Sequence, residues 1–385
     1  MLGLELSDLV FEQGPIRPPS EAYSLLIRAT RNCPWNKCTF CPVYKGQKFE
    51  LRPTQDILKD IETAKSIADE IKALAWKNGN GDRLKDVAAA VYNKYQYDYS
   101  IRNVALWLWT GGECAFLQDA NSLIMKTPDL VTVLSSLKQT FPQINRITSY
   151  ARSKTAAKKS VEELKQLRDA GLSRLHIGME SGSDLVLEYM QKGVTAEDHI
   201  KGGRNVKEAG ISLSEYIMPG LGGKKMSSDH VEGTARVLNA IDPDFIRLRT
   251  LHVRTGMLLQ EKIDSGDFEL QADDEVVKEI GSLIEKLEVT GYIPSDHIAN
   301  LLPEIEGKFP EAKTKCLDII QRYLALPPQE RINYRVGRRT GYYEKLDDLY
   351  DAYKHQRVDE AIKRISKESK DDIDELIRRL TTDLI

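Results

Sequence analysis

Short apolar segments rich in β-branched residues alternate, over the first two thirds of the chain, with longer segments whose apolar residues recur every three or four positions. The short segments have the length and composition of buried strands, and the longer ones have the period of amphipathic helices. Such alternation is typical of βα units around a parallel sheet. The pattern predicts six strands, at Ser24–Thr30, Cys114–Leu117, Arg146–Ala151, Arg174–Met179, Leu213–Met218 and Phe245–Val253.

The helices between these strands have clear ends. Residues 160–170 place Val161, Leu164 and Leu167 at helical spacing, and Gly171 follows where a helix is expected to stop. Six strands with crossover helices predict an α/β protein built as a partial (β/α)6 barrel of the TIM type. Barrels of this kind carry their chemistry at the carboxyl ends of the strands, so functional side chains are expected there.

Two regions depart from this rhythm. Residues 56–99 are too long for one crossover helix and are interrupted at Gly79–Gly81, so they predict an insertion of two or three helices. Beyond residue 258 the strand pattern stops, and the sequence is helical and highly charged, ending at 359–385 in one or two polar helices. We therefore expect a barrel domain at 1–257, including the insertion, and a helical region at 258–385 that closes the barrel.

Composition narrows the class of protein. The chain has 385 residues, of which 41% are hydrophobic and 29% charged, with a formal net charge of −3. This balance gives no global electrostatic reason to expect binding to nucleic acid, which makes a nucleic-acid partner unlikely at this stage. The first residues are acidic where a secretory signal would be basic and then apolar, and no apolar run approaches the ~18 residues that span a bilayer. A cytoplasmic protein without a membrane partner is expected.

Cysteine usage supplies the strongest chemical signal. Three of the five cysteines fall within the nine-residue segment CPWNKCTFC, as Cys33, Cys38 and Cys41, and no histidine lies near them. An odd number of cysteines, clustered in this way, indicates metal binding more than disulfides. Three thiolates can hold a four-iron, four-sulfur cluster and leave one iron open for a small chelating molecule. A zinc site would need a fourth ligand, which the segment does not offer; Cys114 and Cys316 are expected to be buried free thiols.

This segment resembles the cluster-binding loop of the radical S-adenosylmethionine (SAM) superfamily, although it has four residues, where three are usual, before the second cysteine. Phe40 matches the aromatic residue that precedes the third cysteine and packs near the SAM adenine in that superfamily. The similarity continues to about residue 255, and is densest at IGMESGSD and EYIMPGLGG. These segments resemble the branch that includes the methylthiotransferases, oxygen-independent coproporphyrinogen oxidase and the elongator catalytic subunit.

The resemblance implies a SAM site at successive strand ends. It places Gln118–Asn121 at the methionine amino group, Glu180 at the ribose or amino group, and Tyr216–Met218 at the adenine. The resulting cofactor-binding residues are Phe40, Gln118, Asp119, Asn121, Ser149, Arg152, Glu180, Tyr216 and Met218, of which Ser149 and Arg152 face the methionine carboxylate or the ribose. One alternative stays open, because Gly111-Gly112-Glu113 spells the string that often binds the methionine amine in this superfamily.

Candidate substrate residues follow the last strand. Arg247 and Arg249 lie two positions apart, so both point to one face of a strand, where they could grip a carboxylate or phosphate or simply be solvated. His297 follows Asp296 in a predicted loop, which could hold a substrate, although the pattern favours a helix N-cap for Ser295 and Asp296. A local basic group, more typical of packing or of a phosphate contact than of nucleic-acid binding, comprises Arg331, Arg335, Arg338 and Arg339.

The expected function is that of an oxygen-sensitive radical SAM enzyme, an oxidoreductase or lyase. The resemblance implies that a low-potential donor of the flavodoxin or ferredoxin type reduces the cluster, which cleaves SAM to a 5′-deoxyadenosyl radical. That radical would abstract hydrogen from a small-molecule substrate that the sequence does not identify. Two alternatives are SAM-dependent group transfer without the radical and a non-catalytic iron–sulfur module. A third, tRNA modification, draws on the elongator resemblance and is disfavoured by the balanced charge.

Overall fold

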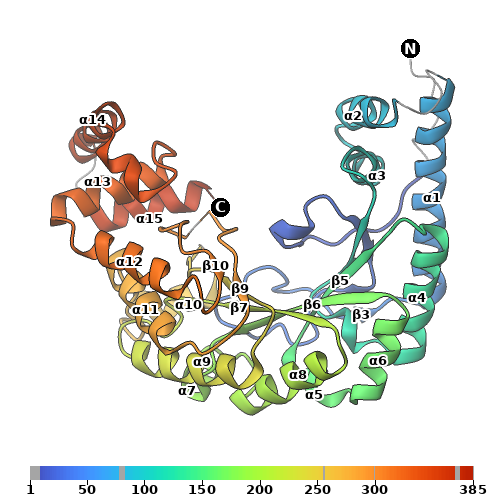
Figure 1. Cartoon of the computed structure of the whole chain (residues 1–385), viewed down its shortest axis with the longest axis horizontal. Coiled ribbons are helices and arrows are strands. Elements are labelled where there is room, and N and C mark those ends of the chain that lie inside the picture. Colours follow the sequence, from blue (N-terminus) through green and yellow to red (C-terminus); the bar gives the residue numbers. More distant parts are fainter. Residues whose placement is uncertain (1–8, 78–82, 255, 299, 369–372, 385) are drawn as a thin grey trace. The chain divides into compact units, whose positions relative to one another are not determined.

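The computed structural model of the chain describes residues 9–77, 83–254, 256–298, 300–368 and 373–384. Residues 1–8, which include part of the acidic N-terminal segment, and the Gly79–Gly81 interruption lie outside these ranges. Within them the chain is a mixed α/β protein, and the strands of its main sheet are mostly parallel, as expected (Figure 1).

The chain folds into two compact units. Unit 1 comprises residues 1–36, 43–177 and 201–213, and unit 2 comprises 37–42, 178–200 and 214–385. The cysteine segment passes from one unit to the other, because Cys33 belongs to unit 1 whereas Cys38 and Cys41 belong to unit 2. The expected division at residue 257 stays a prediction.

Unit 1 contains the first strands of the sheet. β1 (Leu25–Arg28) pairs in parallel with β4 (Cys114–Gln118), β4 with β5 (Arg146–Ala151), and β5 with the first residues of β6 (Leu172–Glu180). The predicted strands are therefore confirmed. In β1, β4 and β5 the central residues are buried, which explains why these segments read as apolar runs.

A small antiparallel pair, β2 (Thr30–Arg31) and β3 (Glu50–Leu51), follows β1. The residues between β2 and β3 include the cysteine segment, so this pair fixes the two ends of the loop that carries the three cysteines. The short η1 (Pro19–Glu21) precedes β1.

The insertion is helical, as expected. α1 (Thr54–Lys77), α2 (Leu84–Lys94) and α3 (Tyr99–Trp109) pack on one another, and α1 and α3 also contact β1. The remaining helices of this part of the chain are η2 (Ser122–Ile124), α4 (Thr127–Thr140), α5 (Ser153–Lys158), α6 (Val161–Asp169) and α8 (Ala196–Glu208). α6 begins with a capping box between Ser160 and Glu163, which explains where the predicted helix starts.

Unit 2 continues the sheet with most of β7 (Ser212–Ile217) and with β8 (Phe245–Leu248), which pair in parallel. β8 ends at Leu248, five residues earlier than predicted. The physical reason is Asn300, whose amide donates to the Leu248 carbonyl at 3.1 Å and accepts from the Thr250 amide at 3.5 Å. This side chain satisfies backbone groups that a neighbouring strand would otherwise bind.

The expectation that strands stop after residue 258 is wrong for two short ones. β9 (Tyr292–Ile293) pairs in parallel with β8 through Phe245 and Tyr292, and β10 (Gly307–Lys308) pairs antiparallel with β9. Two-residue strands have too few alternating positions to leave a pattern in the sequence.

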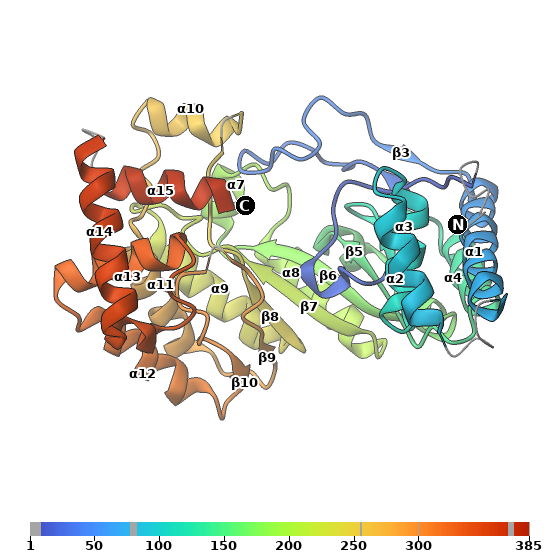
Figure 2. The same ribbon diagram turned by 90° about the horizontal axis from the view of Figure 1, so that it is seen from above.

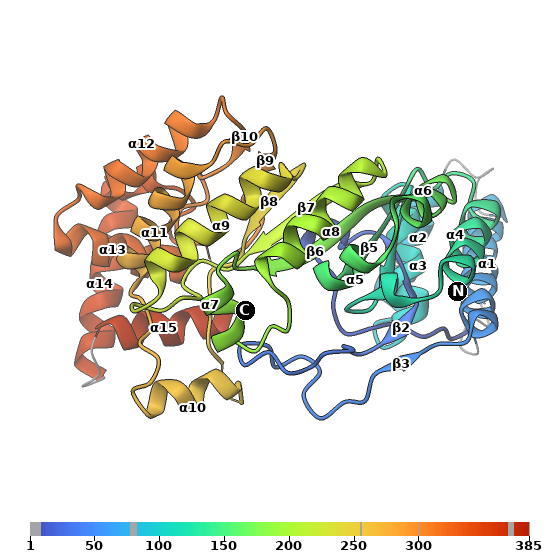
Figure 3. The same cartoon turned by 90° about the horizontal axis from the view of Figure 1, so that it is seen from below.

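The helices of unit 2 are mostly C-terminal. They are α7 (Asp184–Tyr189), α9 (Ser227–Ile241), α10 (Leu258–Asp264), α11 (Asp273–Lys286), α12 (Lys313–Leu324), α13 (Pro328–Arg339), η3 (Leu346–Tyr350), α14 (Ala352–Glu368) and α15 (Ile373–Leu384). α11 packs against α9 and α12, and Figure 3 shows α9 beside α11. α13 packs against α14 and α15, which are the polar terminal helices expected from the sequence (Figure 2). Among the described residues, no helix is both long and apolar enough to span a membrane.

Candidate functional site

The first part of the cysteine loop is held in unit 1 by the end of β4. The Asn32 backbone amide, directly before Cys33, donates to Asp119 Oδ2 at 3.2 Å. The same carboxylate pairs with the Arg28 guanidinium at 2.7 Å and accepts from the Tyr44 hydroxyl. Burial raises the pKa of the Asp119 carboxyl, and Arg28 opposes that shift by favouring the charged form. Asp119 therefore acts, within the chain, as an anchor for the loop.

Two further predicted residues meet beside this anchor. The Asn121 carbonyl oxygen accepts from the Arg152 backbone amide at 3.0 Å, and its amide donates to Thr155 Oγ1 at 2.9 Å. The Arg152 guanidinium lies 5.2 Å from the ring centre of Trp35, a residue of the cysteine segment. Arg152, held by Asn121, thus contacts the loop that bears Cys33, and the role of both residues toward SAM stays a prediction.

Gln118 and Ser149 are buried and engaged with the backbone. The Gln118 amide donates to the Gly14 and Ile16 carbonyls at 3.0 and 2.9 Å, and its oxygen accepts from the Gly14 amide at 2.9 Å. The Ser149 hydroxyl donates to the Leu117 carbonyl at 3.0 Å. These contacts tie down the N-terminal segment and the β4–β5 pair; a role of either side chain toward SAM stays a prediction.

The two polar segments around β4 lie at opposite ends of that strand, and which of them binds the methionine amine stays a prediction. Gly111 and Gly112 directly follow helix α3, with φ of 112° and 72°, and Glu113 precedes the first residue of β4. This segment therefore lies at the amino end of the strand, whereas Gln118–Asn121 lies at its carboxyl end, where barrel chemistry is expected. Glu113 instead accepts a hydrogen bond from Asn145 at 3.1 Å.

The second part of the cysteine loop is held in unit 2. The Thr39 amide donates to the Met190 carbonyl, and the Thr39 carbonyl accepts from the Leu259 amide, both at 3.0 Å. Phe40 is only 7% exposed and belongs to an apolar cluster against which the side chains of Cys38 and Cys41 pack. The loop is thereby fixed after α7 and at the start of α10. The cluster comprises Phe40, Val186, Met190, Leu221, Leu259 and Phe268.

Phe40 also lies beside a charged pair. The Lys192 ammonium is 5.6 Å from the Phe40 ring centre and 3.1 Å from Glu180 Oε1. Glu180 has a φ of +64°, and its carbonyl accepts from the Met218 amide at 2.9 Å. Met218 packs on the same apolar cluster as Phe40. Three residues that the resemblance assigns to SAM, from the loop and from the ends of β6 and β7, are therefore neighbours in unit 2.

Gly178 makes room for this pair. A Cβ atom at Gly178 would lie 2.3 Å from Glu180 Oε1 and 3.3 Å from Lys192 Nζ, so a larger residue would displace the carboxylate or the ammonium. Sequence analysis missed Lys192, because a lysine after a helix end has no distinguishing pattern.

Sequence analysis also missed Glu215, in the middle of β7. Its side chain is fully buried, and neither carboxylate oxygen has a hydrogen-bond partner among the described residues. Burial raises the pKa of the Glu215 carboxyl well above its usual range, and the nearby charge of Glu180 raises it further. Both effects favour the neutral form of the Glu215 carboxyl in the folded protein. The available signal was a glutamate inside an otherwise apolar strand, SLSEYI.

The basic residues of β8 form an ion-pair group that was not foreseen. Arg247 and Arg249 both pair with the carboxylate of Asp296, the latter at 2.7 Å, and Arg249 lies 4.9 Å from the ring centre of Tyr216. Arg247 is 4% exposed and also donates to Ser214 Oγ at 3.0 Å. Asp296 thus binds both arginines, and their role toward a substrate stays a prediction.

His297 follows this carboxylate in the chain. Its pKa is lowered to about 4, first by burial and then by the charge of Arg249 and other arginines. A histidine in this setting is neutral near pH 7, so it could act as an acceptor or base but not as a cation. Its assignment to substrate stays a prediction.

The segment IGMESGSD is tied to unit 2 by a buried polar network. His230 Nδ1 lies 2.9 Å from the Ser181 hydroxyl, and Glu279 accepts from the Gly220 amide at 2.7 Å. His230 Nε2 lies 3.7 Å from Glu279, and burial lowers the pKa of His230. The two glycine-rich segments after β6 and β7 are thus held by α9 and α11.

The cysteine thiols have the chemistry that an iron–sulfur cluster needs. All five cysteines are free thiols, and Cys33, Cys38 and Cys41 are partly exposed, whereas Cys316 is buried. Cys114, also expected to be buried, is partly exposed at the start of β4. Within the described residues, no group of three or more Cys, His, Asp or Glu side chains is gathered as a preformed metal site. Three partly exposed thiols within nine residues, in a segment without histidine, nevertheless suit the cluster.

Comparison with known proteins places the chain in a family. The model of the radical SAM superfamily matches residues 27–237, which is more than half of the chain. A tRNA uridine(34) acetyltransferase of Methanocaldococcus jannaschii is 22% identical over 82% of this chain, and a 4′-phospho-dehydrooxetanocin synthase of Priestia megaterium is 27% identical over 57%. This chain spans 58% and 27% of the lengths of those two proteins.

A solved structure of coproporphyrinogen III oxidase from Escherichia coli, described as a radical SAM enzyme, is also similar. It is 15% identical, with a TM-score of 0.45, over 74% of this chain and 56% of that one. At this level of similarity, membership of the family rests on the match of the sequence to the family model.

The comparisons correct one expectation. The expected partners were a small-molecule substrate and no nucleic acid, whereas a relative that matches most of this chain is named for its action on tRNA. The physical reason for the error is that a net charge of −3 is a sum over the whole chain. Such a sum does not report a local basic surface, which is what binds phosphates.

The loop geometry, the thiol chemistry and the match over residues 27–237 agree. Since that match covers more than half of the sequence, the chain is an enzyme that belongs to the radical SAM superfamily, with a four-iron, four-sulfur cluster and SAM as its cofactors.

Proposed function

We propose that this protein is a radical SAM enzyme that acts on RNA, with tRNA as the substrate class. The observation that carries the proposal is the similarity, over 82% of the chain, to a tRNA uridine(34) acetyltransferase. Because the chain spans 58% of that relative, the proposal covers RNA as the substrate and does not extend to acetyl transfer.

We propose that Cys33, Cys38 and Cys41 hold the cluster as thiolates. Bound and reduced, the cluster and SAM supply one-electron chemistry that can remove a hydrogen atom from an unactivated carbon. Within unit 1, Asp119 and Arg152 contact the part of the loop that bears Cys33, and within unit 2 the backbone of Thr39 holds the part that bears Cys38 and Cys41.

The carboxylate of Glu180 would accept hydrogen bonds from hydroxyl or ammonium donors of SAM. The Lys192 ammonium lies 3.1 Å from this carboxylate and holds its orientation, and the Phe40 ring, 5.6 Å from that ammonium, supplies an apolar neighbour. Glu180→Gln should weaken SAM binding by roughly tenfold, the loss of one charge-assisted hydrogen bond. Unchanged affinity in anaerobic calorimetry would show that Glu180 serves only to position Lys192.

The experiment for the function is anaerobic reconstitution with iron, sulfide, SAM and dithionite, with and without total tRNA. We expect 5′-deoxyadenosine to form, tRNA to increase its rate, and Cys38→Ala to abolish it. S-adenosylhomocysteine or methylthioadenosine as the main product would instead indicate group transfer without the radical. If tRNA neither binds nor changes the products, RNA is not the substrate.

A further inference from the structure

A cavity of about 820 Å³ lies in unit 2, beyond the carboxyl end of β8. Its lining comes from the segment after β8, from the segment between α10 and α11, and from the two helices α13 and α15. Part of its wall, Leu251 and Leu270, packs on the apolar cluster that holds Phe40 and the two cysteines of this unit. The cavity is therefore adjacent to the loop that carries Cys38 and Cys41. Its volume falls in the range of ligand sites, about 300–1,000 Å³.

Cationic side chains dominate the charged lining. Four carboxylates line the cavity, Glu269, Asp273, Asp374 and Glu375. The cationic residues are six, Lys224, Arg254, Arg335, Arg339, Arg378 and Arg379. Arginine stays charged at any physiological pH, so the lining has a surplus of positive charge before any ligand binds.

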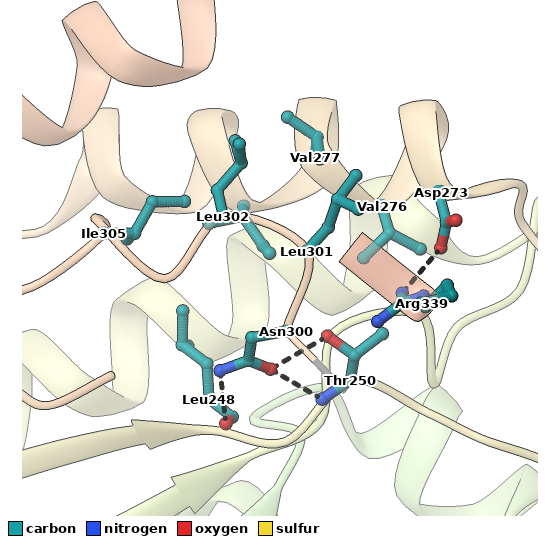
Figure 4. A pocket seen from close by; sticks show the side chains of 11 residues that line it. Leu248, Thr250, Asp273, Val276, Val277, Asn300, Leu301, Leu302, Ile305 and Arg339 are labelled. Carbon is teal, nitrogen blue, oxygen red and sulfur yellow. Dashed lines mark hydrogen bonds and ion pairs between the residues drawn. The ribbon is translucent and has the colours of Figure 1, made fainter. Parts of the chain in front are cut away.

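The carboxylates form ion pairs with only some of these cationic residues. Asp273 pairs with Arg335 at 3.0 Å and with Arg339 at 3.3 Å, and the Asp273–Arg339 pair is drawn in Figure 4, beside a smaller neighbouring pocket. Asp374 pairs again with Arg335 at 2.5 Å, and Glu375 pairs with Arg378 at 2.7 Å. These pairs fix the α13 and α15 side of the wall.

Arg254 is different. Its backbone amide contacts the Met257 sulfur at 3.4 Å, but its guanidinium makes no ion pair or hydrogen bond within the ranges of the chain that the structure describes. The Arg254 guanidinium can therefore donate its N–H groups to a ligand bound in the cavity.

The positive charge of the cavity wall contributes to lowered pKa values of two nearby histidines. The pKa of His252, which lines the cavity, is lowered first by burial and then by Arg254 and Arg339. The same two arginines contribute to the lowered pKa of His297. Burial is the larger cause for both histidines, and the shared contribution of Arg254 and Arg339 is consistent with a surplus of positive charge on this side of the cavity.

We infer that this cavity binds phosphate groups of the RNA substrate, with Arg254 as a direct phosphate ligand and with Arg339 contributing to the positive field. The inference rests on the proposed function, because the phosphates are taken to belong to RNA. A phosphate oxygen would satisfy the free guanidinium and offset the surplus charge of the wall. Positioning of an RNA strand here would bring it next to the loop that bears two of the cluster ligands.

The test measures the affinity of total tRNA for the reconstituted protein and its variants, by fluorescence anisotropy at about 50–300 mM KCl. Arg254→Gln should weaken binding by about tenfold and make the logarithmic salt dependence shallower by roughly 0.7–0.9, the loss of one phosphate contact. Arg254→Lys should recover part of the affinity, because it restores the charge but not the fork. Arg322→Gln is the matched control, since Arg322 lies on α12, outside the cavity lining, in an exposed pair with Asp347.

The outcomes separate the inference from the proposed function. If the unmodified protein binds tRNA and Arg254→Gln binds it equally well, the cavity is not the phosphate site, while the RNA proposal stands. If the unmodified protein does not bind tRNA, the RNA proposal fails. A parallel titration with uridine monophosphate detects a third outcome: a loss confined to the mononucleotide would show that the cavity binds a free nucleotide, which would overturn the assignment to RNA.

Discussion

The carboxylate of Asp296 offers the sharpest test of how unit 2 is held together. It bridges the guanidinium groups of Arg247, which lies in β8, and Arg249, which directly follows that strand. The substitution Asp296→Asn keeps the shape and removes the charge. Two buried or nearly buried arginines then lose the carboxylate that they share.

The size of the effect follows from burial. Side-chain exposures are 5% for Arg247, 13% for Arg249 and 23% for Asp296. Breaking a buried ion pair by removing one partner costs about 3–5 kcal/mol, because an uncompensated charge stays behind. Asp296 is partly exposed and Arg247 keeps its bond to Ser214, so the lower end, about 3 kcal/mol, is expected.

The assay is urea unfolding followed by far-ultraviolet circular dichroism. With a slope of about 3 kcal/mol per molar urea, the midpoint of Asp296→Asn should fall by about 1 M. Asp347→Asn serves as the control, because Asp347 and its partner Arg322 have side-chain exposures of 57% and 43%, a surface pair worth about 0–1 kcal/mol. Equal midpoints for the two variants, at an unchanged slope, would refute the reasoning. The arginines would then be compensated by solvent or by another group.

Three further predictions concern the cysteines, a buried acid and a glycine contact. Substitution of Cys33, Cys38 or Cys41 by alanine should abolish the iron–sulfur absorbance and most of the bound iron. Alanine at Cys114 or Cys316 should preserve both. The pKa of the Glu215 carboxyl is raised in the folded protein, so as pH rises above 4.5 the unfolded chain loses this proton first and the unmodified protein loses stability. Glu215→Gln removes this effect. Relative to the unmodified SAM-free protein, the variant should therefore gain unfolding free energy with rising pH, by at most about 1.4 kcal/mol per pH unit. A pH-independent difference in unfolding free energy between pH 4 and 8 would contradict a neutral Glu215. Gly182→Ala should destabilise by about 1–3 kcal/mol in urea unfolding, because its Cβ would lie 2.3 Å from the Gly233 carbonyl oxygen, and no loss would mean that the backbone yields freely there.

Local pattern was sufficient for much of the fold. The strands β1, β4, β5, β6, β7 and β8 were predicted because each has several alternating or continuous apolar positions, which is a property of the segment itself. The same holds for the cysteine segment, whose ligand number and spacing are readable without any neighbour. β9 and β10 were missed because two residues leave no period, and the end of β8 was misplaced because Asn300, 52 positions away, binds Leu248.

The sequence alone was also sufficient to identify the cofactor class, because the cysteine segment and its resemblance to the radical SAM loop are local features. It could not give the partner of each charge. Arg28 meets Asp119 across 91 positions, Arg247 meets Asp296 across 49, and Asp273 gathers Arg335 and Arg339 across more than 60. Which charges pair depends on their distance in the folded chain, and the stabilisation that a pair provides depends on its burial. A local sequence pattern contains neither. For the same reason only the tertiary structure could reveal that the Arg254 guanidinium, on the wall of a basic cavity, has no ion pair or hydrogen bond among the described residues, and that among these residues the buried Glu215 carboxyl has no hydrogen-bond partner.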